Sequence, residues 1–146
     1  MKLKTVEFLS LVIGLLVMGV FWGTWFTPTR SIHDFSAAEF IHIGKTIIAN
    51  VAVPMRIIMP TTLIVMLLAC WYSWNVNRTT FYYYSGSFAL MVVCLIITVG
   101  IEVPIDNQIK TWTETTIPSN WEELRQRWDV FHTTRTFTSI GSIALF

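Results

Sequence analysis

Four long apolar segments with very few charges constrain this chain more than any other feature of its sequence. Crossing about 30 Å of hydrocarbon takes roughly 20 mostly apolar residues in a helix. Only 13% of the 146 residues are charged, whereas soluble domains carry about 25%. The first apolar run is too long for the core of a cleaved signal peptide, so we expect it to be retained. We therefore predict an all-α integral membrane protein, a single-domain four-helix bundle with spans at residues 6–27, 57–74, 81–101 and 130–146.

The two long connections, residues 28–56 and 102–129, are expected on the same side of the membrane because an even number of spans separates them. The first connection contains Ser36 and Glu39 at the spacing of a capping box. Apolar residues at helical spacing follow. We therefore predict a helix at about 37–53 that lies at the interface or leads obliquely into the second span.

Two prolines mark expected helix boundaries. Pro60 is expected in the opening turn of the second span, where its missing N–H costs little. Pro104 is expected to break the third helix just after its span. This break would bring Glu102, Asp106 and Asn107 to the same membrane face as His132.

The last helix carries the most unusual pattern in the chain. Ser119 and Glu122 have the spacing of a second capping box, so we expect this helix to start near residue 120 and to continue into the fourth span. At 3.6 residues per turn, one narrow face carries Trp121, Arg125, Trp128, His132, Arg135 and Ser139. Ionisable residues within a span are expensive and usually face the protein interior. His132 and Arg135 are therefore predicted to form a site, unless Arg135 snorkels or pairs with an acid such as Glu102 and only locks the helices together.

The C-terminal motifs resemble the signature of the anthrone oxygenase-like membrane family, which is related to noranthrone monooxygenase. The resemblance is carried by Val103-Pro-Ile-Asp-Asn107, Trp112, Trp121 and Leu124-Arg125-x-Arg-Trp128-x-x-Phe-His132-x-x-Arg135. The family pattern often has two asparagines where this chain has Asp106 and Asn107. By position, the resemblance implies catalytic roles for His132, Arg135 and Asn107. It implies substrate-binding roles for Trp112, Trp121, Arg125 and Trp128.

The resemblance also implies an activity. Characterised relatives oxidise an anthrone to an anthraquinone with molecular oxygen as co-substrate and without a tightly bound organic cofactor. The anthrone methylene is acidic because its carbanion is an aromatic phenolate. His132 is the natural base by its intrinsic pKa, and Arg135 or Arg125 with the Asn107 amide would stabilise the oxyanion. We therefore expect an oxygen-dependent oxidase or monooxygenase of a lipophilic aromatic or quinone-like substrate.

A metal site is a second chemistry that the spacing allows. Glu39 with His42, and Asp129 with His132, each place an acid and a histidine three residues apart, as in carboxylate-bridged di-metal bundles. Glu102 would add a ligand. Two further carboxylate helices are not evident, so ligand spacing alone does not establish a metal.

A non-catalytic function is the remaining alternative, because fold does not fix function. Such a membrane protein would bind a quinone or lipid, or would scaffold a partner. An enzyme should present His132 and Arg135 to an enclosed pocket, whereas a scaffold should bury them in a satisfied ion-pair network. The expected partners are the lipid bilayer of a plasma or inner membrane and a hydrophobic small molecule. The net charge of +1 gives no attraction to nucleic acid, and homo-oligomers remain open.

Overall fold

The computed structural model describes residues 3–146, and nearly all of them are helical. The elements in chain order are α1 (Leu3–Phe26), the 3-10 helix η1 (Thr29–Asp34), α2 (Ala37–Trp74), α3 (Arg78–Ile97), the π-helical turn η2 (Thr98–Glu102), α4 (Val103–Thr111) and α5 (Trp121–Leu145). No strand forms within this range, so the all-α prediction is confirmed. Three helical stretches of the described chain are long and apolar enough to cross a membrane: Leu3–Asp34, Ala37–Trp74 and Arg78–Thr111.

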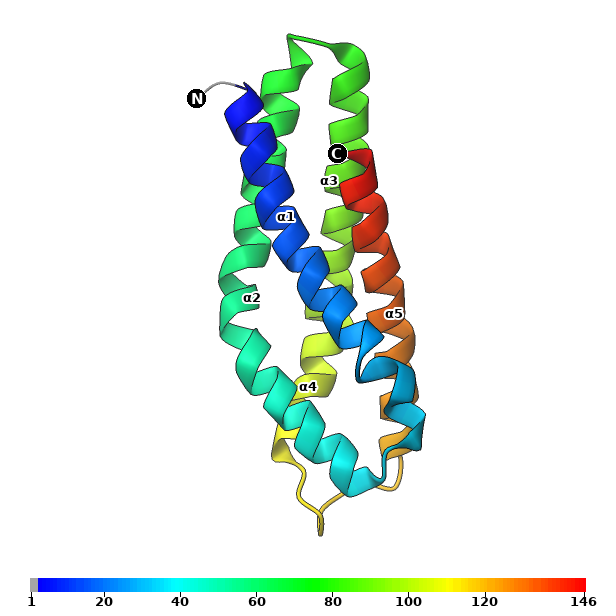
Figure 1. The fold of residues 1–146 in the computed structure, drawn as a ribbon. Helices are drawn as coiled ribbons and strands as arrows, with labels where there is room; N and C mark the ends of the chain where they lie inside the picture. Colours follow the sequence, from blue (N-terminus) through cyan, green and yellow to red (C-terminus); the bar gives the residue numbers. More distant parts are fainter. Residues whose placement is uncertain (1–2) are drawn as a thin grey trace.

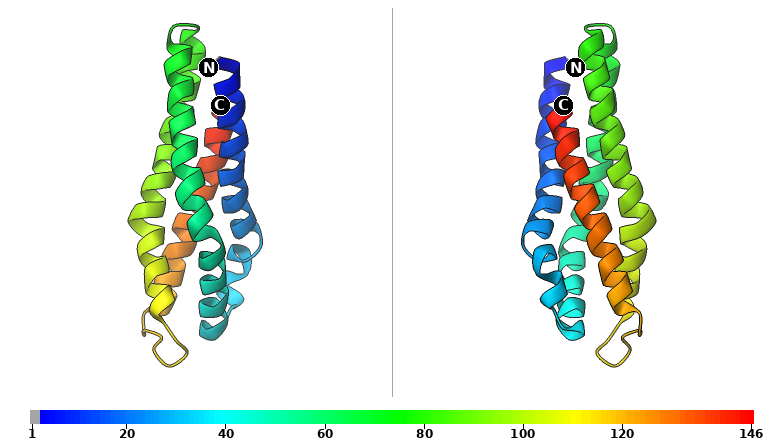
Figure 2. Two further views of the ribbon diagram at one scale, coloured as in Figure 1. Left: turned by 90° about the vertical axis from the view of Figure 1, so that its left-hand side faces the viewer. Right: turned by 90° about the vertical axis from the view of Figure 1, so that its right-hand side faces the viewer.

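The longest helices pack lengthwise, and α1 and α3 each contact both α2 and α5 (Figure 1). The start of α1 and the end of α5 point toward the same end as the α2–α3 turn. At the opposite end lie η1, the start of α2, α4 and the loop before α5 (Figures 1 and 2). We call this the loop end. Both long connections therefore lie on one side of the molecule, as predicted.

Helix α2 starts at a capping box, as the sequence predicts. The Glu39 N–H donates to Ser36 Oγ, and the Glu39 carboxylate accepts from the Ser36 N–H at 2.8 Å. The helix then runs unbroken through Pro54 and Pro60, so the expectation that Pro60 lies in an opening turn is wrong. Each proline removes one backbone hydrogen bond, which helices in an apolar surrounding tolerate when neighbouring groups satisfy the freed carbonyl.

The third helix does not break at Pro104, contrary to the expectation from the sequence. The α3 helix widens into the π-turn η2, and α4 follows directly, so that one continuous helical rod extends from α3 to Thr111. Pro104 occupies the first turn of α4, where its missing N–H is tolerated. Glu102, the last residue of η2, is directed into the interior and is 0% exposed.

The predicted capping box at the start of α5 is also wrong. The helix begins at Trp121 with Asn120 as its N-cap, and no side chain caps it. Glu122 and Glu123 lie in the first turn, where the helix dipole favours negative charge. The buried side chains of α5 are all polar or charged: Arg125, His132, Arg135, Thr136, Ser139 and Ser142.

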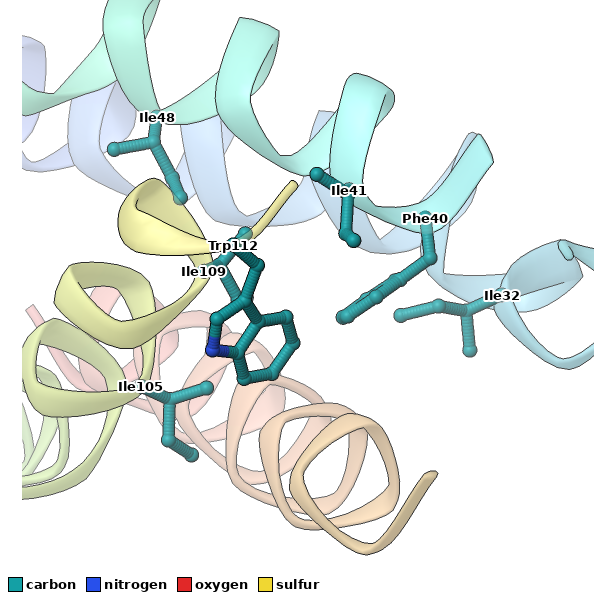
Figure 3. Packing of buried hydrophobic residues seen from close by; sticks show 7 residues of the cluster. All are labelled: Ile32, Phe40, Ile41, Ile48, Ile105, Ile109 and Trp112. Carbon is teal, nitrogen blue, oxygen red and sulfur yellow. The ribbon is translucent and has the colours of Figure 1, made fainter. Parts of the chain in front are cut away.

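Apolar side chains close the loop end. The loop-end cluster consists of Ile32, Phe40, Ile41, Ile48, Ile105, Ile109 and Trp112 (Figure 3). It joins η1, α2 and α4, and Trp121, Leu124 and Trp128 of α5 pack against it. Burying a large apolar side chain contributes about 1.5–3 kcal/mol. The cluster therefore fixes the short elements that surround the inward face of α5.

Candidate functional site

Three buried ionisable side chains meet where η2 packs against α5. Arg135 Nη2 lies 3.0 Å from Glu102 Oε2, and Arg135 Nε and Nη2 donate to His132 Nδ1 at 3.2 and 2.8 Å. Arg135 Nη1 donates to Thr98 Oγ1 at 3.1 Å. We call Glu102, His132 and Arg135 the polar triad. The three-residue spacing puts His132 and Arg135 on one helix face, and η2 supplies the carboxylate.

Aromatic rings surround the polar triad. The His132 ring stacks on Trp128 with centroids 4.7 Å apart and planes at 6°, and Arg135 Cζ lies 4.6 Å from the centroid of Phe21. Because His132 Nδ1 accepts from Arg135, the neutral imidazole carries its proton on Nε2. Within residues 3–146, His132 Nε2 and Glu102 Oε1 are buried without a hydrogen-bond partner. Glu102 Oε2 meets the guanidinium as an ion pair, not as a well-aligned hydrogen bond.

A mostly apolar cavity adjoins the polar triad at the loop end. Its polar lining comes from Thr24, Asp106, Trp128 and Arg135. Its apolar walls are Pro28, Ile32, Phe35, Phe40, Ile43, Gly44, Ile47, Ile48 and Ile109. The volume of the cavity is about 50 Å³, which is room for a few water molecules. An apolar cavity with a few convergent polar groups is the usual form of a small-molecule site.

Asp106 gives this cavity a carboxylate in addition to the Arg135 guanidinium. Asp106 lies in the first turn of α4, one turn beyond Glu102 along the same rod. Its Oδ1 accepts from the Trp128 indole N–H at 3.2 Å. Trp128 therefore has two partners: its N–H holds Asp106, and its ring covers His132.

The sequence profile of one family, described as anthrone oxygenase, matches residues 49–145. The chain belongs to the anthrone oxygenase family. The match includes the whole polar triad, Asp106 and Trp128, and excludes η1 and α1. No curated protein matches the chain, and no solved structure does.

In this member of the anthrone oxygenase family, the predicted face of α5 points inward, but its residues divide between two locations. Arg135 and Trp128 line the cavity. His132, 1% exposed, lies behind Trp128. The pairing of Arg135 with Glu102, which the sequence offered as an alternative to a site, is present. Cavity and ion pair therefore occur together, and the guanidinium belongs to both.

Arg125 and Trp121 lie nearer the start of α5 and hold η1 in place. Arg125 Nη1 donates to the carbonyl oxygens of Ile32 and Phe35 at 3.2 and 3.1 Å. Its guanidinium lies 4.6 Å from the centroid of the Trp121 ring, and that ring packs against Phe40. These two residues support the cavity wall rather than line the cavity.

The structure does not bring Trp112 and Asn107 to the cavity. Trp112 is 6% exposed and packs inside the loop-end cluster (Figure 3). Its carbonyl oxygen accepts from Lys45 Nζ. Asn107 lies on the exposed side of α4, where its Oδ1 accepts from Lys110 Nζ at 3.1 Å.

The acid and histidine pairs that suggested a metal site make other contacts. The Glu39 carboxylate bonds to Ser36 at the start of α2, and Asp129 Oδ2 lies 3.0 Å from His33 Nε2. Among the described residues, no three histidine, cysteine or acidic side chains gather in a way that would hold a metal ion.

The roles of two residues of the site were not predicted from the sequence. Thr98, which accepts from Arg135, lies within an uncharged apolar run and gives no signal there. Asp106 was expected on the same membrane face as His132 and differs from the asparagine of the family pattern, but no role was predicted for it. Its signal is its position, one helical turn after Glu102, once the helix is known to continue past Pro104.

Proposed function

We propose that this protein is a four-span membrane oxygenase that converts the methylene of a lipophilic, anthrone-like aromatic compound to a ketone with molecular oxygen. One observation carries the proposal: Arg135, held from behind by Glu102 and His132, reaches the wall of an otherwise largely apolar cavity. A fixed cation in such a cavity favours a neutral substrate that develops negative charge on an oxygen during the reaction. An anthrone does this when its methylene proton leaves.

The outer face of α5 supports its role as the fourth span. Between residues 130 and 146, the exposed side chains are Val130, Thr134, Phe137, Ala144 and Leu145. The Thr134 hydroxyl donates to the carbonyl of Val130 at 2.8 Å, so nothing on this face needs water. The average hydropathy of α5 underestimates how apolar its outer face is, because the polar side chains that lower the average are buried. The last exposed charge of the helix is Arg127, which would mark the membrane border.

The proposed reaction balances with dioxygen alone. The methylene loses a proton, and the electron pair delocalises onto the ketone oxygen beside Arg135. The carbanion gives its electrons to O2, and a carbon–oxygen bond forms to give a hydroperoxide. Loss of water then leaves the second ketone, so that one oxygen atom enters the product and the other enters water.

The geometry favours a positioning role for His132. Its Nδ1 lone pair accepts two N–H groups of Arg135, which orients the guanidinium toward the cavity. The role of proton acceptor, which the sequence suggested for His132, stays a prediction. A tricyclic substrate needs more room than a few water molecules, so its binding requires wall side chains such as Phe35 and Phe40 to move.

Turnover of anthrone by the purified protein in lipid nanodiscs tests this function. Under 18O2, we expect anthraquinone with one labelled oxygen, formed faster than in empty nanodiscs. Arg135→Lys keeps the charge but loses the guanidinium fork, and the rate constant kcat should fall about 10²–10³-fold. Arg127→Lys on the exposed side of the same helix is the matched control and should leave kcat unchanged. Turnover no faster than in empty nanodiscs, or an unaffected Arg135→Lys variant, would refute the proposal.

The second candidate is a non-catalytic protein that binds a quinone or lipid. The buried Glu102–Arg135 pair favours it, because such a pair also locks α5 against η2 without any chemistry. Tight binding of anthraquinone without turnover of anthrone would support this candidate against the oxygenase.

A further inference from the structure

Asp106 is the one side chain lining the described cavity that can take up a proton. The other polar lining groups are a threonine, an indole and a guanidinium, none of which is a base at neutral pH. Asp106 Oδ1 is fixed by the Trp128 indole N–H at 3.2 Å. No hydrogen bond engages Oδ2 within residues 3–146.

The other two candidate bases are less well placed. Glu102 is 0% exposed, does not line the cavity, and pairs with Arg135 at 3.0 Å. His132 is 1% exposed, also does not line the cavity, and its Nδ1 lone pair accepts from Arg135. A base must reach the proton it removes directly or through one water molecule. Asp106 alone of the three meets that condition without rearrangement of the polar triad.

We propose that Asp106 is the catalytic base, which removes the methylene proton of a substrate whose ketone oxygen lies against Arg135. This inference rests on the proposed function and concerns the site of this chain, because the family pattern often has asparagine where this chain has Asp106. The carbon–hydrogen bond breaks, an O–H bond forms on Asp106, and the electron pair moves through the ring system to the ketone oxygen. An aspartate base opposite an oxyanion-stabilising group is a known solution for removing a proton beside a carbonyl group. Trp128 is a positioning residue, because its N–H orients the carboxylate.

Proton removal needs no oxygen, so it can be measured apart from oxidation. The experiment incubates anthrone anaerobically in D2O with the protein in nanodiscs and follows deuterium entry at the methylene by mass spectrometry. Asp106→Asn keeps an oxygen acceptor for Trp128 but cannot take up the proton. We expect its exchange rate at saturating anthrone to fall about 10²-fold or more. Affinity for anthrone, followed by tryptophan fluorescence, should stay within about tenfold.

Two further variants complete the design. Asp106→Glu returns a carboxylate on a longer side chain and should recover part of the exchange. Asp34→Asn changes an exposed carboxylate in η1, outside the cavity lining, and should exchange at the wild-type rate.

The outcomes separate the two proposals. Exchange that depends on Asp106 but is followed by no oxidation in air would refute the oxygenase and leave Asp106 as the base. Oxidation in air with full exchange by Asp106→Asn would refute the role of Asp106 and leave the oxygenase. Failure of the wild-type protein to bind anthrone would overturn both.

Discussion

Replacement of Glu102 by alanine should destabilise the fold, because it leaves the Arg135 guanidinium as a buried charge without its acidic partner. Glu102 is 0% exposed, and its carboxylate is the only acidic group within 4 Å of the Arg135 guanidinium among the described residues. Removing one partner of a buried ion pair leaves an uncompensated buried charge and costs about 3–5 kcal/mol. The hydrogen bonds from Arg135 to His132 and Thr98 remain, so we expect the lower part of that range.

A double-mutant cycle isolates the pair. Glu102→Leu with Arg135→Met replaces both charges by apolar groups of similar length, and such replacements are often neutral or stabilising. We therefore expect the double variant to unfold near the wild-type midpoint, with a coupling energy of about 2–3 kcal/mol. The assay is reversible unfolding in mixed micelles, followed by tryptophan fluorescence. Two results would refute a close buried pair. One is a Glu102→Ala variant whose free energy of unfolding lies within about 1 kcal/mol of wild type. The other is a double variant that loses more free energy of unfolding than the two single variants lose together.

Two further predictions concern the packing and the placement of the helices. A Cβ on Gly14 would lie 2.7 Å from Ile143 Cδ1, whereas one on Gly19 meets nothing within 4 Å. Ala in place of Gly favours a helix, but at residue 14 the Ile143 side chain must shift to make room. Gly14→Ala should therefore unfold at a lower midpoint than Gly19→Ala, and equal midpoints would contradict this packing of α1 on α5. Thr134→Cys, in a background without the native cysteines, should resist a water-soluble maleimide in liposomes, and Arg127→Cys should react. Equal labelling of the two would contradict α5 as a span.

Much of the helical framework could be predicted from the sequence because hydropathy and periodicity report on it directly. Uncharged runs of spanning length predicted the apolar helices, and the 3.6-residue period placed His132 and Arg135 on one inward face. The capping box at Ser36 was predictable because its partners are only three residues apart. The pairing of Arg135 with Glu102 was one of the alternatives to a site, because a lone charge in an apolar interior is costly.

The parts of the site that depend on long-range packing could not be predicted. Pro104 signals a helix end locally, yet the π-turn η2 lets the rod continue and turns Glu102 inward. Arg125 donates to the backbone carbonyl groups of Ile32 in η1 and of Phe35, the residue after η1. Backbone acceptors of this kind cannot be predicted from a pattern of side chains. Trp112 matches a family motif, but only its neighbours in the loop-end cluster reveal a packing role.

The most direct test of the central claim is an experimental structure of the protein in nanodiscs with anthraquinone bound. We expect the planar ligand in the cavity at the loop end, with one ketone oxygen about 2.7–3.2 Å from a nitrogen of Arg135. The opposite ring position should face Asp106. Ligand bound elsewhere, for example against Trp71 and Trp74 near the α2–α3 turn, with Arg135 still enclosed by Glu102 and His132, would contradict the account.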